Sequence, residues 1–297
     1  MKTMEKRKKK KINKGNLLFD IFNFCIMLLV IGVTLFPILH VLAASLSSPT
    51  AVSEGKVSLW PVDLTLYSYK TVFSMDNIWT SYGNTVFYSF VGTALSMILT
   101  ILGAYPLSKK RLRGRTFISF MVAFTMWFGA GMMPIYLNFR NFGLLDTRLS
   151  ILLFSAVSAF NMLLLRTYFE SIPDSIEESA KIDGASDFRI LFTMFLPLSK
   201  AALMTVSMYY LIGRWNAYFW ASILIRDEAK VPLQVILRKL VVEMNQTAEL
   251  GNMDYSKSSR ETITYAIMIV ATLPMLVVYP YVQKFFVKGV VVGAVKG

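Results

Sequence analysis

Six long stretches with no charged residue, or with only one, constrain this chain more than any other feature. A helix that crosses a bilayer needs about 20 apolar residues. In lipid, only helices and closed barrels satisfy every backbone polar group, and these stretches lack the in-and-out alternation of barrel strands. The sequence therefore predicts an all-α, polytopic membrane protein with six transmembrane helices. Five stretches are free of charge and the fifth in order contains only Arg214: 21–44, 86–107, 117–139, 149–165, 201–225 and 262–283.

The positions of the basic residues predict the orientation of these spans. The chain has a net charge of +13, and only 16% of its residues are charged, against about 25% in soluble domains. With six spans, twenty Lys and Arg residues fall on the side of both termini and ten on the opposite side. Cytoplasmic loops carry such an excess, so both termini are expected to be cytoplasmic. The basic segment 1–16 then fits a juxtamembrane position, and a nucleic-acid partner is not expected.

Sequence signatures of catalysis and of metal binding are missing. No G-x-x-x-x-G-K-[ST] phosphate loop occurs, so the chain itself is not expected to hydrolyse ATP. Cys25 and His40 are the only residues of their kinds, too few for a metal cluster, a disulfide or a nucleophile–base pair. We expect no catalytic residue, no metal and no cofactor bound by this chain. A channel, a transporter subunit and a structural membrane protein remain.

Two outer segments, 45–85 and 226–261, are long. The second contains a pattern of apolar residues after Pro232 that predicts a short amphipathic helix. That helix is expected to lie on the membrane or on its own domain, or to offer a surface to an external partner.

A short charged helix is predicted between the fourth and fifth spans. Ser175 followed by Glu178 is a possible capping box, and Gly184 suits a left-handed stop, which predicts a helix over 176–183. A helix of two turns is not stable alone in water, so it must dock on something. Its apolar side chains available for docking are Ile176, Ala180 and Ile182.

The spacing of this region resembles a family motif. Glu178-Ser179-Ala180, then Gly184, then Leu196-Pro197 resembles the cytoplasmic E-A-A…G…L-P motif of the permeases of binding-protein-dependent ABC importers. Ser179 and Met194 depart from the motif, which has Ala and Ile there. The terminal sequence "FVKGVVVGAVKG" resembles the end of G-type maltose permeases. The resemblance assigns ATPase coupling to Glu178, Ser179, Ala180, Asp183, Gly184, Leu196 and Pro197.

The resemblance also implies an architecture and an assembly. It implies a type I importer permease domain over 17–287 with a coupling helix at about 174–185, preceded by the basic segment 1–16 and followed by a cytoplasmic tail, 288–297. It implies a second, homologous permease, two cytoplasmic ATPase subunits that hold ATP and Mg, and an extracytoplasmic solute-binding lipoprotein. The expected location is the plasma membrane of a Gram-positive bacterium.

The substrate path is expected near the end of the fifth span. Arg214 is costly within a membrane and either snorkels to the interface or faces a wet cavity. Aromatic faces and amides suit sugar rings, although the same aromatic residues also suit an interfacial belt. The candidates are Arg214, Trp215, Asn216, Tyr218 and Trp220, with Asn84, Ser155, Ser158 and Asn161 as weaker ones.

These observations predict the permease subunit of an ATP-driven importer for a carbohydrate, an oligosaccharide in particular. The alternatives are an importer permease for a non-sugar solute, and a structural or assembly membrane protein without a transport path. A secondary transporter is disfavoured because no inverted internal repeat is found.

Overall fold

The structure is a computed structural model that describes residues 14–250 and 257–294, and the side chains of 19–242 and 260–280. The described chain divides into two compact units. The first comprises the described residues up to 69 with those of the segment 253–266. The second comprises those of 70–252 and 267–297.

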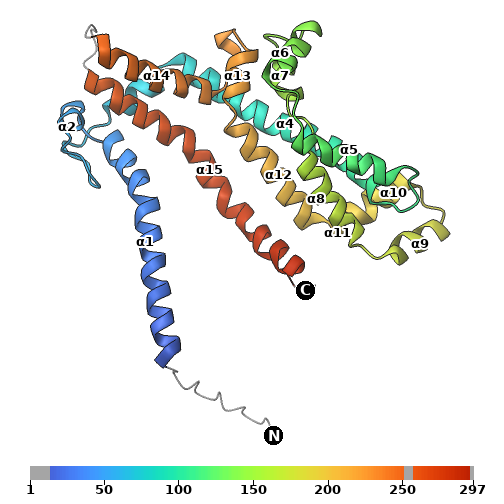
Figure 1. Ribbon diagram of the computed structural model, residues 1–297. Coiled ribbons are helices and arrows are strands. Elements are labelled where there is room, and N and C mark those ends of the chain that lie inside the picture. Colours follow the sequence, from blue (N-terminus) through green and yellow to red (C-terminus); the bar gives the residue numbers. More distant parts are fainter. Residues whose placement is uncertain (1–13, 251–256, 295–297) are drawn as a thin grey trace. The chain divides into compact units, whose positions relative to one another are not determined.

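Helices are the regular structure of the described part of the chain, which contains no strand, and the predicted all-α class is confirmed (Figure 1). In order they are α1 (Lys14–Ser45), α2 (Pro49–Ser53), α3 (Tyr67–Phe73), α4 (Asp76–Ser108), α5 (Arg115–Trp127), α6 (Met132–Asn141), α7 (Arg148–Leu153), α8 (Ala159–Glu170), α9 (Asp174–Ile182), α10 (Asp187–Ile190), the π-helical turn η1 (Leu191–Phe195), α11 (Leu196–Leu198), α12 (Lys200–Trp215), α13 (Phe219–Leu224), the 3₁₀ turn η2 (Glu228–Lys230), α14 (Leu233–Leu250) and α15 (Lys257–Ala294).

Three described helical stretches are long and apolar enough to cross a membrane: Phe19–Ser45, Asp76–Ser108 and Arg260–Pro280. Two further pairs pass the same test together but are sharply bent. Arg115–Trp127 meets Met132–Asn141 at 112°, and Asp187–Leu198 meets Lys200–Trp215 at 85°. The described residues thus supply up to five spans by length and composition. The count of six and the cytoplasmic termini stay predictions.

The predicted continuous span 149–165 is wrong. It is divided between α7 and α8, because the chain leaves helical geometry at Phe154 and Ser155 has a positive φ of 55°. Ser158 then starts α8, its hydroxyl accepting from the amide of Asn161. Serines compete with helical backbone bonds and favour such breaks. A stretch of apolar residues without a charge is therefore not always one continuous helix, and here it forms parts of two.

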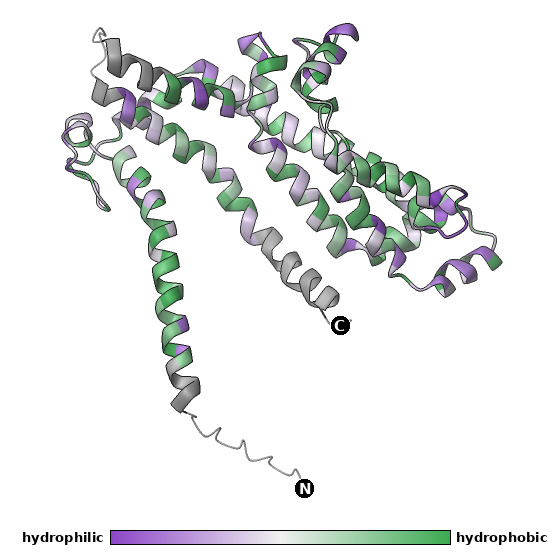
Figure 2. Ribbon diagram, viewed as in Figure 1, coloured by the Kyte–Doolittle hydropathy of each residue, from purple (hydrophilic) through white to green (hydrophobic). Residues whose placement is uncertain are grey.

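In the first unit, the described side chains of α1 are mostly exposed and apolar, as expected of a helix surrounded by lipid (Figure 2). Its last turn packs against α2 through Ala43, Ala44 and Ala51. His40, for which no chemistry was expected, bonds through Nδ1 to the carbonyl of Ser58 at 3.0 Å. This unit positions the start of the segment 45–85, which was predicted to lie on the outer side.

The second unit is built on α4, against which α7, α8, α12, η2 and α14 all pack. The buried face of α4 carries small polar residues at a helical repeat, among them Ser81, Ser89, Ser96 and Thr100. Small residues let membrane helices approach closely and bond across the contact. Thr100 shares a 2.7 Å hydrogen bond with the hydroxyl of Tyr210 on α12.

The predicted amphipathic helix after Pro232 is α14, and it is longer than expected. Its buried residues Leu233, Val235 and Ile236 lie where it packs on α4, and the Leu233 amide donates to Thr85 Oγ1 at 2.8 Å. The helix therefore docks, at least at its start, on its own domain. Residues 1–13 and 295–297 of the predicted tails lie outside the described part, and α15 runs on to Ala294, past the expected domain end at 287.

Candidate functional site

The short helix α9 forms where the sequence predicted one, with a different start. Its N-cap is Pro173, without a side-chain cap, so the predicted capping box of Ser175 and Glu178 is wrong. Asp174 and Glu177 lie in its first turn, where carboxylates complement the positive end of the helix dipole. Ser175 lies inside the helix, and its carbonyl accepts from Ser179 Oγ at 2.8 Å.

The end of α9 is closed by Gly184, as predicted. Gly184 has a φ of 77°, and its amide donates to the carbonyl of Lys181 at 3.0 Å. The amide of Ala185 donates to the carbonyl of Ala180 at 2.9 Å. These two bonds make a Schellman end, which satisfies the last carbonyls of the helix. The helix therefore has a fixed length and a fixed exit direction.

One side of α9 is packed and the other is open. Ala180, 2% exposed, belongs to the same core cluster as Leu165, Phe169 and Ile190. Ile182, one of the apolar side chains expected to be available for docking, is 87% exposed. Glu178, Ser179 and Asp183 are exposed as well, while Leu196 packs on the core cluster and Pro197 is exposed. A two-turn helix thus presents most of its motif side chains outward.

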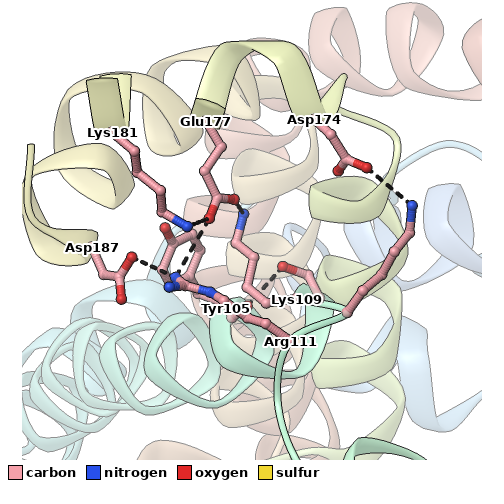
Figure 3. A network of polar contacts seen from close by, with 9 residues as sticks. Tyr105, Lys109, Arg111, Asp174, Glu177, Lys181 and Asp187 are labelled. Carbon is pink, nitrogen blue, oxygen red and sulfur yellow. Dashed lines mark hydrogen bonds and ion pairs between the residues drawn. The ribbon is translucent and has the colours of Figure 1, made fainter. Parts of the chain in front are cut away.

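Ion pairs connect α9 to the loop after α4 (Figure 3). Glu177 binds Lys109 at 2.5 Å and Lys181 at 2.6 Å, and lies 3.4 Å from Arg111. Arg111 also binds Asp187 at the start of α10, at 2.5 Å. We call Lys109, Arg111, Glu177, Lys181 and Asp187 the ionic cluster. It joins three elements that are separate in sequence.

Lys109 and Glu177 are the most enclosed members of the ionic cluster, with side chains 11% and 13% exposed. The Lys109 ammonium lies 3.5 Å from the ring centre of Phe195 and 4.5 Å from that of Tyr105, within cation–π distance. A second pair, Lys110 with Asp174 at 3.0 Å, joins the same loop to the same helix but is 81% and 72% exposed. Exposed pairs contribute about 0–1 kcal/mol, so the enclosed pair dominates the attachment.

Burial and charge act in opposite directions within the ionic cluster. Burial raises the pKa of Glu177, but hydrogen bonds from Lys109 and Lys181, with the charges of both, outweigh burial and hold that pKa below its usual value. Burial lowers the pKa of Lys109, and its hydrogen bond to Glu177 opposes this only in part. Glu177 therefore stabilises the charged form of Lys109 against the effect of burial.

A cleft of about 410 Å³ lies between α7, α8, α12 and α13. Arg214 and Trp220 line this cleft. Three weaker candidates for the substrate path also line it: Ser155, Ser158 and Asn161. Trp220 packs on Phe154 with ring centres 4.6 Å apart and the ring planes tilted by 34°. The cleft wall is mostly apolar, with aromatic rings and a few polar groups, a combination suited to a ligand with hydroxyl groups and apolar faces.

Arg214 is held by the protein itself. Its Nη1 donates to the carbonyl of Ile151 at 3.1 Å, and its Nη2 donates to Ser96 Oγ at 2.8 Å and to the carbonyl of Leu152 at 3.1 Å. Ile151 and Leu152 are near the end of α7, so Arg214 satisfies carbonyls that the broken helix leaves without a helical partner. Its guanidinium is thus turned onto α4 and α7 and does not snorkel.

Gly92 on α4 makes room for this guanidinium, and a methyl group there is expected to destabilise the protein. A Cβ at Gly92 would lie 2.5 Å from Arg214 Nη1, so the guanidinium would have to move and lose its hydrogen bonds. We expect Gly92→Ala to cost about 1–3 kcal/mol, as overpacking does. Gly83→Ala on the same helix, where nothing lies within 4 Å, is the control and is expected to be neutral or stabilising. Thermal unfolding of the purified protein measures both, and equal midpoints would contradict the prediction.

A family model described as the binding-protein-dependent transport system inner membrane component matches residues 16–292, nearly the whole chain. The chain belongs to this family of importer permeases. It is accordingly a membrane protein and a transporter subunit, not an enzyme.

Individual relatives agree with the family. The permease is 41% identical to the polygalacturonan/rhamnogalacturonan transport system permease protein YtcP of Bacillus subtilis (strain 168) over 95% of this chain and 99% of that one. It is 37% identical to Protein LplC of the same organism over 96% and 97%. A solved chain of a bacterial ABC transporter involved in the import of the acidic polysaccharide alginate has 44% identity and a TM-score of 0.85, covering 94% of this chain and 100% of that one.

Not every predicted path residue of the permease reaches the cleft. Trp215, 4% exposed, is packed, with its Nε1 donating to the carbonyl of Ala271 at 3.2 Å. Asn216 bonds to the carbonyl of Ile212, and Tyr218 lines a different hollow. Asn84 holds the carbonyls of Ala229 and Val231. Of the five main candidates, only Arg214 and Trp220 line the cleft.

The sequence reasoning also missed residues of the permease that the structure brings together. Glu177, Lys109 and Gly92 were not among the candidates. The i, i+4 spacing of Glu177 and Lys181 and the five basic residues of the loop 108–116 were available signals for the ionic cluster. No local signal relates Gly92 to Arg214, because 122 residues separate them.

Proposed function

We propose that the permease imports a carbohydrate, and specifically an oligosaccharide, delivered by an extracytoplasmic solute-binding protein. The observation that carries this is the similarity along almost the full chain to permeases named for polysaccharide transport, YtcP and the alginate transporter. The cleft supports it, because its wall combines apolar and aromatic groups such as Trp220 with polar groups such as Asn161, and sugars present hydroxyl rims and apolar faces.

The proposed assembly follows the family. A second, homologous permease completes the path, and two ATPase subunits hold ATP and Mg on the cytoplasmic side. The binding protein is a lipoprotein on the outer face of the plasma membrane of a Gram-positive bacterium, since YtcP and LplC are Bacillus proteins. No nucleic acid takes part.

In this proposal α9 is the coupling helix. Its open face, with Glu178, Ser179, Ile182 and Asp183, docks on an ATPase subunit, while the ionic cluster and Ala180 fix it to α4 and α10. A helix whose backbone bonds are closed at Gly184 can move as a rigid body when two ATPase subunits close around ATP. The helix would then transmit that motion to the spans.

Uptake into proteoliposomes tests the proposed substrate class. The permease is reconstituted with its partner permease, ATPases and binding protein, and uptake of labelled oligosaccharides is compared with uptake of glycerol phosphate and of a peptide. We expect ATP-dependent accumulation of an oligosaccharide only. Accumulation of glycerol phosphate or peptide instead would support the non-sugar alternative, and an assembly without an ATPase would support a structural role.

A further inference from the structure

A second hollow, of about 680 Å³, lies between α13 and α14. Tyr218 and Ser222 of α13 contribute to its wall, together with apolar residues including Ile225 and Val235. Its volume falls within the range of about 300–1,000 Å³ that is usual for ligand sites. We call it the α13–α14 groove.

Among the described side chains, which on α14 end at residue 242, the lining of the α13–α14 groove contains three cations, Arg226, Arg238 and Lys239, and no carboxylate. Lys239 is paired with Glu228 at 3.2 Å. Among the described residues, no ion pair joins Arg226 or Arg238 to an acid. The nearby carboxylate of Asp146 accepts from the backbone amides of Arg226 and Asp227 at 3.1 and 3.0 Å, so it is held by the backbone. The described lining of the groove therefore has an excess of positive charge.

The groove adjoins the cleft. Both use α13 as a wall: Tyr218 and Ser222 line the groove, and Trp220 and Ala221 line the cleft. Because α13 follows α12 in the chain, both hollows are close to the C-terminal end of α12. This end is about 24 Å from the N-terminal end, where α10 and α11 lie, since α12 has 16 residues. A solute entering from the α13–α14 end would meet the groove before the cleft.

We propose that the α13–α14 groove binds the carboxylates of an acidic oligosaccharide through Arg226 and Arg238. This rests on the proposed function and narrows it, from oligosaccharides in general to those with uronate groups. Arginine is suited to the role because its guanidinium can bind a carboxylate through two parallel hydrogen bonds. Tyr218 offers a ring face and Ser222 a hydroxyl at the same wall, as a sugar requires.

Transport kinetics test this proposal with two probes of the same skeleton. Trigalacturonate carries three carboxylates, and its trimethyl ester, in which all three are esterified, carries none. In the reconstituted complex, Arg226→Gln and Arg238→Gln are each expected to raise KM for trigalacturonate about tenfold or more, because a hydrogen bond to a charged group is lost. The kcat for trigalacturonate and the kinetics of the ester are expected to stay unchanged. Arg140→Gln, which removes an exposed cation outside the groove, is the matched control.

Each other outcome overturns the proposal in a distinguishable way. Transport of trigalacturonate with an unchanged KM in both variants would overturn the groove and leave the proposed function intact. An equal rise in KM for both probes would mean that the groove docks the binding protein. Transport of the ester or another neutral sugar alone would reject an acidic substrate, and transport of no oligosaccharide at all would reject the proposed function as well.

Discussion

Glu177→Gln is expected to reduce substrate-stimulated ATP hydrolysis and uptake at least tenfold in the assembled transporter. The change leaves the Lys109 ammonium, 11% exposed, without its carboxylate. Breaking a buried ion pair by removing one partner costs about 3–5 kcal/mol, and the low end applies to this slightly exposed pair. About 3 kcal/mol corresponds to roughly a hundredfold shift between attached and detached α9.

Asp174→Asn is the matched control, because it removes the other ion pair between the same loop and the same helix. Lys110 and Asp174 are 81% and 72% exposed, so the expected cost is about 0–1 kcal/mol. Membrane insertion and retention of the ATPase are measured for both variants beside hydrolysis. If Glu177→Gln and Asp174→Asn behave alike, the ionic cluster does not hold the coupling helix.

Gly184→Val is expected to abolish most uptake, whereas Gly184→Asn retains much of it. The left-handed conformation at Gly184 costs a non-glycine residue about 1 kcal/mol or more, and a β-branched residue suffers most. Asparagine tolerates this conformation better than other side chains. Within the described chain nothing lies within 4 Å of a Cβ at Gly184, so neither variant meets a clash there.

The pair of variants separates backbone strain from contact with a partner. Loss of activity in both, with normal insertion, would place the side chain against the ATPase surface, so contact rather than strain would be responsible. Loss in the valine variant alone would assign the effect to the end of α9. Normal uptake and normal ATPase stimulation in both would contradict a coupling role for this helix.

Much of the fold follows from local sequence, and the errors have a common physical origin. Apolar length located α1 and α4, and Gly184 located the end of α9, because these signals act within a few residues. The capping box failed because the helix has its N-cap at Pro173, two residues before Ser175. The span 149–165 failed because hydropathy does not register the backbone turn at Ser155.

The candidate sites were predictable only where the signal lies within a few residues of the chain. The motif spacing located α9, but the ionic cluster depends on Lys109, 68 residues before Glu177. Trp215 and Arg214 are adjacent in sequence, yet one is packed against Ala271 and the other lines the cleft. Helical residues one position apart face different directions, and only the assembled bundle decides which direction is the cleft.

The hydrogen bonds of Arg214 have a consequence for biogenesis. An arginine within a lone transmembrane helix costs about 2.5–3.5 kcal/mol at the helix centre on insertion scales, and less near the end of the helix, where Arg214 lies on α12. Its acceptors, Ser96 on α4 and the carbonyls of Ile151 and Leu152 on α7, are all synthesised before α12. Elements made earlier can fold first during synthesis. When α12 leaves the insertion machinery, the hydrogen-bond acceptors of Arg214 on α4 and α7 can therefore already be in place. The order of the segments along the gene thus provides the nascent chain with a polar site for its most costly residue before that residue enters the bilayer.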